Sequence, residues 1–161
     1  FGAPTAAGLI KKYNNIIILR TFSKSLGIPS VRFGFILANK KIISIMNSYR
    51  LSYESNFLTD TVVKYFIDNF QIIKNYINKV KIGREYVRNE CKKLGFNVIG
   101  KYSNFLLIDF RNNLLKRKLI KKLNNKKIYV KSNYTGILQN TILVTCGSKQ
   151  IMKKFIKTLK V

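Results

Sequence analysis

The chain contains no histidine and no tryptophan, and only 2 cysteines, 2 prolines and 6 acidic residues among its 161 residues. Without histidine, neither histidine general-base catalysis nor a zinc site of histidine and cysteine ligands is available to these residues. Two cysteines, Cys91 and Cys146, are too few for a disulfide scaffold. The scarcity of proline, together with 47% apolar residues, argues against a disordered segment and predicts a packed core.

Long apolar runs are also missing: none approaches the roughly 20 residues that a membrane-spanning helix requires. The amino end has no charged region, apolar region and cleavage site of the kind found in secretory signals. We therefore expect a soluble, cytoplasmic protein. Because the chain starts at Phe1 rather than Met, with no strand or cap before Pro4, we expect a fragment of a longer sequence.

The shortage of acidic residues leaves a net charge of +25 with 31 Lys and Arg, which raises nucleic acid as a partner. Lysine dominates, at 24 residues against 7 arginines, and it accompanies 22 isoleucines and 17 asparagines. All three abundant residue types have codons poor in G and C. Since arginine is the residue suited to bidentate readout of bases and phosphates, a compositional bias explains the charge more simply than a selected binding surface.

The densest basic stretch, residues 111–131, holds nine Lys or Arg and no acidic residue. Its apolar residues recur at helical spacing and predict one apolar helix face: Leu114, Leu115, Leu119, Ile120 and Leu123. We favour a solvated lysine face over a polyanion-binding patch, because no RNA-binding aromatic motif or zinc finger accompanies this helix.

The apolar pattern before residue 70 predicts two strands and then two helices. Residues 16–19 and 31–38 are apolar runs without alternation, which is typical of strands covered on both faces in a parallel sheet. Helices are expected over about 40–50, capped by Asn39, and over about 57–69.

The longest periodic segment, residues 71–94, predicts an amphipathic helix that Gly95 terminates. Cys91 falls on its apolar stripe, so we interpret it as a core residue and not a reactive thiol. The later pattern predicts strands near 96–99, 104–110, 127–131 and 141–146, the basic helix between the second and third of these, and a last helix over 149–160. This order predicts an α/β protein, with residues 1–70 ending a large, mostly parallel domain and residues 71–161 forming a bridging helix and a small α+β domain.

The most specific chemical pattern lies between Thr21 and Ser30. Lys24 stands on the turn that leaves the first strand, next to hydroxyl residues, and Arg32 follows eight positions later. A lysine becomes a nucleophile toward an aldehyde when desolvation near other cations deprotonates it. The hydroxyls of Thr21 and Ser23 and a guanidinium are donors suited to a phosphate dianion.

The run T-F-S-K-S-L-G-I-P-S resembles the pyridoxal-phosphate attachment signature of the class II aminotransferases. The similarity to histidinol-phosphate aminotransferases extends over nearly the whole chain, through residues 15–43, Arg50 with Tyr53 and Asn56, residues 94–96 and residues 103–107. It implies the carboxyl-terminal part of a fold-type I enzyme dependent on pyridoxal 5'-phosphate. In that family Lys24 would bind the cofactor aldehyde and shuttle the substrate proton, while Ser23, Arg32 and, more weakly, Thr21 would hold the cofactor phosphate.

The resemblance also implies a homodimer that exchanges an amino group between a small amino compound and a 2-oxo acid such as 2-oxoglutarate. Relatives usually carry an arginine for the substrate's anionic group in the late pattern arginine, apolar, threonine, any residue, glycine, where this chain has Leu143. Lys131 stands where relatives often place another arginine, and is equally interpretable as an exposed strand-end lysine. The family's cofactor aspartate, ring-stacking aromatic residue and phosphate-binding helix normally precede the lysine, and none is identifiable here.

Because Leu143 stands in place of the expected substrate arginine, the sequence does not identify the amino donor, and two related functions stay possible. These are a decarboxylase of phosphorylated amino acids and an aminotransferase of surface-polysaccharide or phosphonate synthesis. Two alternatives belong to other functional classes. One is a basic nucleic-acid-binding protein, which rests on the net charge alone, and the other is a catalytically inactive relative of the family.

Overall fold

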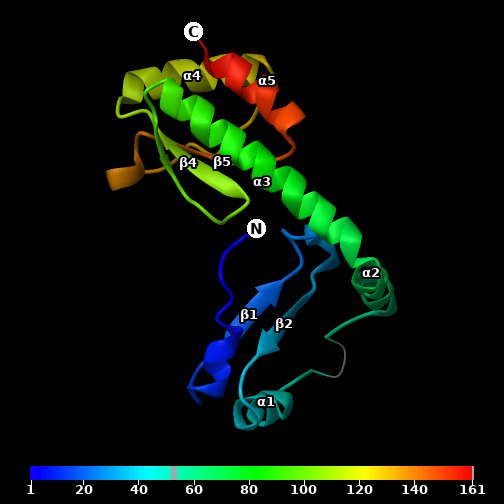
Figure 1. Ribbon diagram of the computed structural model, residues 1–161. Coiled ribbons are helices and arrows are strands. Elements are labelled where there is room, and N and C mark those ends of the chain that lie inside the picture. The colour runs from blue at the N-terminus through cyan, green and yellow to red at the C-terminus, as the bar shows by residue number, and fades with distance from the viewer. Residues whose placement is uncertain (52–53, 161) are drawn as a thin grey trace. The chain divides into compact units, whose positions relative to one another are not determined.

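The computed structural model describes residues 1–51 and 54–160. It divides into two compact units, one formed by Gly2–Tyr76 and the other by Ile77–Val161 together with Phe1. The division falls inside one long helix, α3 (Phe70–Lys93), which is drawn in green in Figure 1. The two units therefore share a continuous helical backbone.

The first unit, Gly2–Tyr76, is built around a strand pair and two helices. Its elements are the 3₁₀ helix Ala7–Lys11, strand β1 (Ile18–Thr21), the 3₁₀ turn Pro29–Val31, strand β2 (Gly34–Leu37), helix α1 (Lys40–Asn47), helix α2 (Phe57–Asp68) and the first turns of α3. Strands β1 and β2 pair antiparallel, with Ile18 opposite Leu37 and Thr21 opposite Gly34. A Cβ atom at Gly34 would lie 2.6 Å from the backbone oxygen of Arg20, so only glycine allows this close approach.

The expectation of two strands in this region is confirmed, but parallel pairing is wrong for these two strands, which pair antiparallel. Parallel pairing of consecutive strands needs a crossover, usually a helix, and residues 22–33 contain only a three-residue 3₁₀ turn. Leu19 is 74% exposed, and all of β2 is exposed. The apolar side chains of these two strands are suited to burial, but in the described part of this unit no element packs over those of Leu19 and β2.

The predicted helices of the first unit are confirmed, with shorter ends. Helix α1 starts after Asn39, whose side-chain oxygen accepts a hydrogen bond from the Ile42 amide at 2.9 Å, as expected for a cap. Helix α2 starts after Asn56, which accepts from the Thr59 amide at 3.0 Å. Helix α1 ends at Asn47, before the expected position 50.

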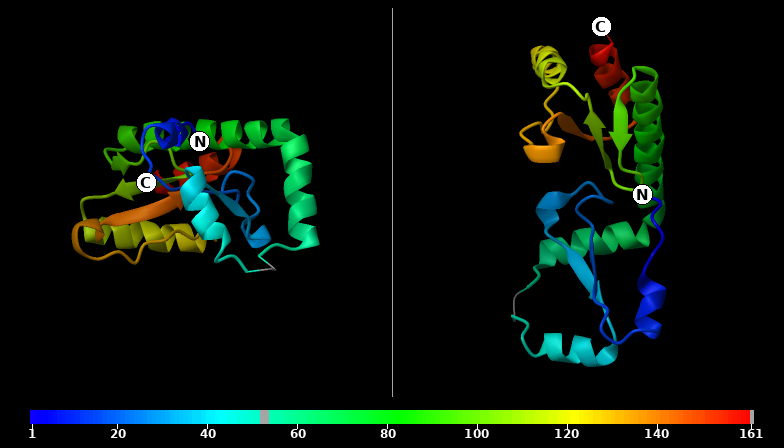
Figure 2. Two further views of the ribbon diagram at one scale, coloured as in Figure 1. Left: turned by 90° about the horizontal axis from the view of Figure 1, so that it is seen from below. Right: turned by 90° about the vertical axis from the view of Figure 1, so that its left-hand side faces the viewer.

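The second unit, Ile77–Val161 with Phe1, is an α+β unit with a three-stranded antiparallel sheet in the order β3-β4-β5. Its further elements are β3 (Asn97–Ile99), β4 (Phe105–Asp109), helix α4 (Asn113–Asn125), the 3₁₀ turn Gly136–Leu138, β5 (Thr141–Thr145) and helix α5 (Lys149–Leu159). Helices α4 and α5 lie side by side, as the views agree in showing (Figure 2). One core joins buried residues of α3, α4, α5 and all three strands.

Most predictions for this unit are confirmed, including the end of α3 at Gly95, which has a positive φ of 80°. The strand predicted near residues 127–131 is wrong. Lys127 has a left-handed φ of 56° at the end of α4, and beyond it only Lys131 forms an isolated bridge, with Leu143. The apolar residues of this segment pack beside the core without a ladder of hydrogen bonds.

Both cysteines are buried and unpaired. Desolvation raises the pKa of the Cys91 thiol to about 12 and that of Cys146 to about 11. The interpretation of Cys91 as a core residue is confirmed, because it is fully buried and its thiol is kept protonated at neutral pH.

Over the described residues, none of the helices combines the length and apolar character needed to cross a bilayer.

Candidate cofactor and substrate sites

The turn after β1 is tied together by the hydroxyls of Thr21 and Ser23. The Thr21 hydroxyl donates to the backbone oxygen of Phe33 at 3.2 Å and accepts from the Ser23 amide at 3.1 Å. The two hydroxyl oxygens lie 2.8 Å apart, so with the Thr21 proton directed at Phe33 the Ser23 hydroxyl is the donor between them. The structure thus brings two of the predicted phosphate-binding residues into direct contact.

Apolar residues on either side of Lys24 anchor this turn. The Phe22 ring stacks on the Phe33 ring, with centroids 5.5 Å apart, and Leu26 is only 8% exposed. The Leu26 amide donates to the Phe22 carbonyl at 2.9 Å, which closes the turn around Lys24. Lys24 itself is exposed and has no hydrogen-bond or ion-pair partner among the described residues. The anchored turn therefore presents a free primary amine.

Arg32 lies in the same connection between β1 and β2, but folds back on its own turn. It has a left-handed backbone, with φ 55° and ψ 42°, and its guanidinium donates to the Pro29 carbonyl at 3.2 Å. Non-glycine residues rarely adopt this backbone, which costs energy that the surrounding turn must offset. Within the described part of the chain, Arg32 forms no hydrogen bond with Thr21, Ser23 or Lys24.

In the second unit, the structure brings Lys131 and Leu143 together. The Leu143 amide donates to the Lys131 carbonyl at 2.8 Å, and the Lys131 ammonium lies 5.4 Å from the centre of the Tyr134 ring. Both residues line a cavity of about 260 Å³ between the end of β5 and α5. Leu143 offers no polar group, so Lys131 and Lys154 are the charged residues of this lining.

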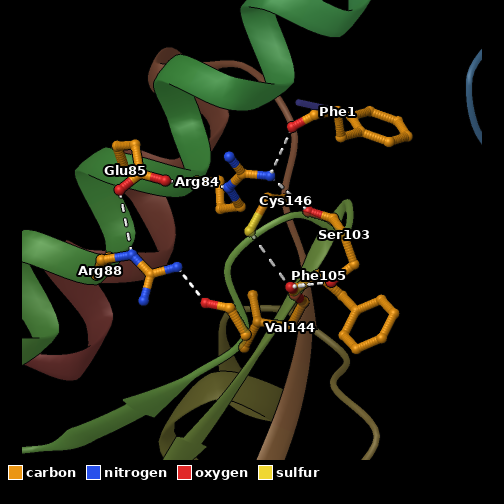
Figure 3. Close-up of polar contacts among 9 residues, drawn as sticks. Phe1, Arg84, Glu85, Arg88, Ser103, Phe105, Val144 and Cys146 are labelled. Atoms are coloured by element: carbon orange, nitrogen blue, oxygen red, sulfur yellow. Dashed lines mark hydrogen bonds and ion pairs between the residues drawn. The ribbon is translucent and has the colours of Figure 1, made fainter. Parts of the chain in front are cut away.

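A buried arginine on α3 fixes the loop between β3 and β4 (Figure 3). Arg84 is 5% exposed and donates to the carbonyls of Ser103, at 2.9 Å, and Phe1, at 3.3 Å, while it pairs with Glu85 at 3.1 Å. Arg88 pairs with the other oxygen of Glu85 and also donates to the Gly100 carbonyl.

The segment after β5 rests directly on α3. A Cβ atom at Gly83 would lie 1.9 Å from the Gly147 backbone oxygen, so the absence of a side chain is what lets the loop approach. The Cys146 amide donates to the Asn104 carbonyl at 2.8 Å, which links the same loop to the start of β4. Sequence reasoning missed this support. The signal available was a glycine inside a strongly periodic helix, followed at once by an arginine.

The model of the family described as aminotransferase class I and II matches residues 1–159. The chain belongs to this family. Among curated relatives, histidinol-phosphate aminotransferase of Brachyspira hyodysenteriae is 33% identical over 159 residues, which are 97% of this chain and 45% of that protein. The chain thus spans less than half the length of this aminotransferase.

Solved structures of this kind confirm the fold-type I, α/β class. Histidinol-phosphate aminotransferase of Sinorhizobium meliloti, solved in complex with pyridoxal-5'-phosphate, superposes with a TM-score of 0.79 at 17% identity, over 93% of this chain and 42% of that one. L-threonine-O-3-phosphate decarboxylase of Porphyromonas gingivalis superposes with a TM-score of 0.71 at 20% identity, over 96% of this chain and 48% of that one. At these identities the superpositions establish the fold alone.

Aminotransferases of class I and II depend on pyridoxal phosphate. The turn after β1 fits this group in its donor chemistry: the exposed amine of Lys24 matches an aldehyde, and the paired hydroxyls of Thr21 and Ser23 match a phosphate.

The segment of Arg50, Tyr53 and Asn56, which resembles the family, is only partly described. Arg50 pairs with Glu54 at 2.7 Å, Asn56 caps α2, and Tyr53 lies outside the described residues.

Proposed function

We propose that this chain supplies the cofactor-binding lysine of a pyridoxal-phosphate-dependent aminotransferase of the histidinol-phosphate type. The enzyme would exchange an amino group between an amino acid or amino-alcohol phosphate and a 2-oxo acid. The observation that carries the proposal is the turn after β1, in which Phe22 and Leu26 anchor the backbone and Lys24 projects free. Membership of the family over residues 1–159 supports it.

Each residue of the turn has a distinct task in this proposal. Lys24 would bind the cofactor aldehyde and, when released, hold and move the substrate's proton at its Nζ atom. Ser23 and Arg32 would hold the cofactor phosphate, with Thr21 orienting the Ser23 hydroxyl through their contact of 2.8 Å. To reach a phosphate, the Arg32 guanidinium would exchange its hydrogen bond to the Pro29 carbonyl for the anion. When bound, the cofactor supplies the electron sink of the reaction.

The experiment that tests the role of Lys24 is reductive trapping. The complete gene product is loaded with pyridoxal phosphate, reduced with borohydride and digested, and the labelled peptide is identified by mass spectrometry. We expect the label on Lys24. Lys24→Ala should abolish the visible absorbance of the bound cofactor and amino transfer to 2-oxoglutarate, whereas Lys12→Ala, a matched change at an exposed lysine, should retain both. A label on another peptide would refute the assignment.

Substrate recognition would involve Lys131, which the bridge to Leu143 places in one cavity with that residue. A lysine presents a point charge and lacks the planar fork with which arginine grips a carboxylate. We therefore expect Leu143→Arg to lower the KM for a carboxylate-bearing donor, and Leu143→Met to leave it unchanged. Equal KM values in both variants would exclude this cavity from donor binding.

A related decarboxylase of phosphorylated amino acids is the second candidate. It is favoured by Leu143 in place of the usual arginine and by the fold shared with the Porphyromonas gingivalis decarboxylase. The two reactions separate in one assay, because decarboxylation releases carbon dioxide without consuming a 2-oxo acid. An aminotransferase of surface-polysaccharide or phosphonate synthesis would instead consume the 2-oxo acid with a different donor.

The organisation of the complete protein is part of the proposal. Residues 1–70 would end the cofactor-binding large domain and residues 71–161 would form the bridging helix and the small domain, which the separation of two units within α3 supports. The family resemblance supports a cytoplasmic homodimer with small-molecule substrates. Sedimentation of the complete gene product measures the oligomeric state.

A further inference from the structure

Lys116, on helix α4, is a buried lysine without a carboxylate partner. It is only 5% exposed, and the one partner of its ammonium among the described residues is the backbone carbonyl of Gln139. A buried lysine is ordinarily paired with an acidic group, because a bare charge is costly to remove from water. An ammonium carries three donors, and a carbonyl neutralises none of its charge.

Beside Lys116 lies a cavity of about 370 Å³. Helix α4 contributes Asn113, Lys116 and Arg117 to its lining, and the segment before β5 contributes Ser132, Tyr134 and Thr135. This segment runs beside α4 (Figure 2). The volume is in the range of sites for small molecules, roughly 300–1,000 Å³. The cavity is separate in sequence from the turn of Lys24.

The polar groups around this cavity are free to bind. Within the described chain, the side chains of Arg117, Ser132 and Thr135 have no hydrogen-bond partner, and Tyr134 makes only a ring contact, with the Lys131 ammonium 5.4 Å from its centroid. A guanidinium, an ammonium and hydroxyls are together the donors that bind phosphate or carboxylate oxygens.

No acidic side chain of the described residues pairs with Lys116 or Arg117; the nearest acid in the sequence, Asp109, accepts a hydrogen bond from the Arg111 amide instead. Residues 110–161 include 14 Lys or Arg and not one Asp or Glu. A genomic bias toward lysine accounts for the charge of the exposed surface, but it does not account for a lysine buried beside an arginine and three hydroxyl groups. The missing counter-charge is the observation that points to a ligand.

We propose that this cavity binds a small metabolite through a phosphate or carboxylate group, which supplies the counter-charge to Lys116 and Arg117. The hydroxyls of Ser132 and Thr135 and of Tyr134 complete the shell of donors. The site is additional to the proposed cofactor and substrate sites and does not depend on the proposed function.

Calorimetric titration of the complete gene product tests the site, with inorganic phosphate and citrate as separate probes at constant ionic strength. We expect saturable binding of at least one probe, and the comparison of the two identifies the preferred oxyanion. Arg117→Gln should weaken that binding about tenfold, the loss of one charge-assisted hydrogen-bonding group. Lys118→Gln removes the same charge from an exposed position on α4 that does not line the cavity, and should change affinity by less than about twofold.

Two further variants make the outcome decisive. Arg32→Gln removes a proposed phosphate ligand from the cofactor turn, so retained binding in this variant excludes that turn as the source of the heat, and Arg117→Gln tests the cavity on α4. Lys116→Met tests the buried ammonium, provided that circular dichroism shows this variant to be folded. If the Lys116→Met variant does not fold, Arg117→Gln is the test of the site. Two outcomes would overturn the proposal. Equal weakening by Arg117→Gln and Lys118→Gln would show that the net charge alone attracts the anion, and the absence of saturable binding would show that there is no site.

Discussion

At the scale of single residues, the two glycines Gly34 and Gly83 have a role that composition does not reveal. Gly34 allows β2 to approach the Arg20 carbonyl, and Gly83 allows the loop after β5 to rest on α3. A glycine inside a helix costs about 1 kcal/mol relative to alanine. The presence of Gly83 in α3 is explained by the contact with Gly147, because the two backbones meet there and no flexible side chain could move to make room for a Cβ atom.

We predict that Gly83→Ala destabilises the second unit. The new Cβ atom would stand 1.9 Å from the Gly147 oxygen, so the loop must shift, at a cost of about 1–3 kcal/mol that outweighs the gain in helix propensity. Thermal unfolding followed by circular dichroism measures the loss. Gly8→Ala is the control, because nothing lies within 4 Å of its Cβ position and its stability should be unchanged or slightly higher. Equal unfolding temperatures for Gly83→Ala and the parent chain would contradict the contact.

The residues of the candidate site were accessible to sequence reasoning because a motif fixes their order and spacing. The hydroxyls of Thr21 and Ser23 are in contact as a consequence of their places on one strand end and its turn. The orientation of Arg32 was not accessible, since it depends on a left-handed backbone and on a hydrogen bond to Pro29. The assignment of these side chains to a cofactor remains a prediction.

At the scale of elements, helices were predicted more accurately than strands. The caps Asn39 and Asn56 are local signals, and the hydrogen bonds they accept arise within three residues. Strand pairing is not local: whether residues 16–19 lie in a parallel sheet or residues 127–131 join a ladder depends on distant partners. The segment after α4 has strand-like composition, but it begins with the left-handed Lys127 and reaches β5 only through the isolated bridge between Lys131 and Leu143.

The cap of α4 gives a prediction at this scale. The Asn112 side-chain oxygen accepts from the Leu115 amide at 3.1 Å, and Asn112→Ala should lower the free energy of unfolding by about 1 kcal/mol because one helix amide loses its partner. Urea unfolding measures the change. Asn124→Ala, near the other end of the same helix, should cause no comparable loss. If both variants lose equal stability, the cap does not contribute.

At the scale of the whole molecule, the sequence determined the class of each half but not what covers its surfaces. The core of the second unit follows the apolar periodicity of α3, α4 and α5, except that in α4 Leu114, expected on the apolar face, is exposed and Lys116, expected on the solvated face, is buried. In the first unit the same reasoning predicted buried strands, whereas Leu19 and the residues of β2 are exposed. The periodicity of apolar residues shows which side chains favour burial, but it does not identify the element that packs against them.

Glu90 on helix α3 pairs with Lys160 at the end of α5, so its ionisation affects how two elements of the second unit are held together. We therefore consider the dependence of stability on pH at the scale of the whole unit. Hydrogen bonds from Lys93, at 2.8 Å, and from Lys160, at 3.0 Å, lower the pKa of Glu90 from its ordinary value of 4.5. A lowered pKa in the folded state means that the contribution to stability is present above pH 4.5 and is lost as the pH falls through the folded pKa.

We therefore predict that Glu90→Gln reduces stability at neutral pH and flattens its decline in acid. Urea unfolding between about pH 3 and pH 7 measures both effects. Asp68→Asn is the matched control, because its pair with Lys64 is exposed and lies in the first unit. A decline in acid as steep as that of the parent chain would show that Glu90 is not the group responsible.

Helix α3 belongs to both units without interruption, and this affects how the molecule would be cut into pieces. Proteases cleave exposed, irregular backbone in preference to an intact helix. Digestion would therefore begin in the long connections, such as the one between α4 and β5, and would spare the place where one unit gives way to the next. The larger fragment from such a cut would hold the first unit together with part of the second, so the cleavage site would not mark the boundary between the two units.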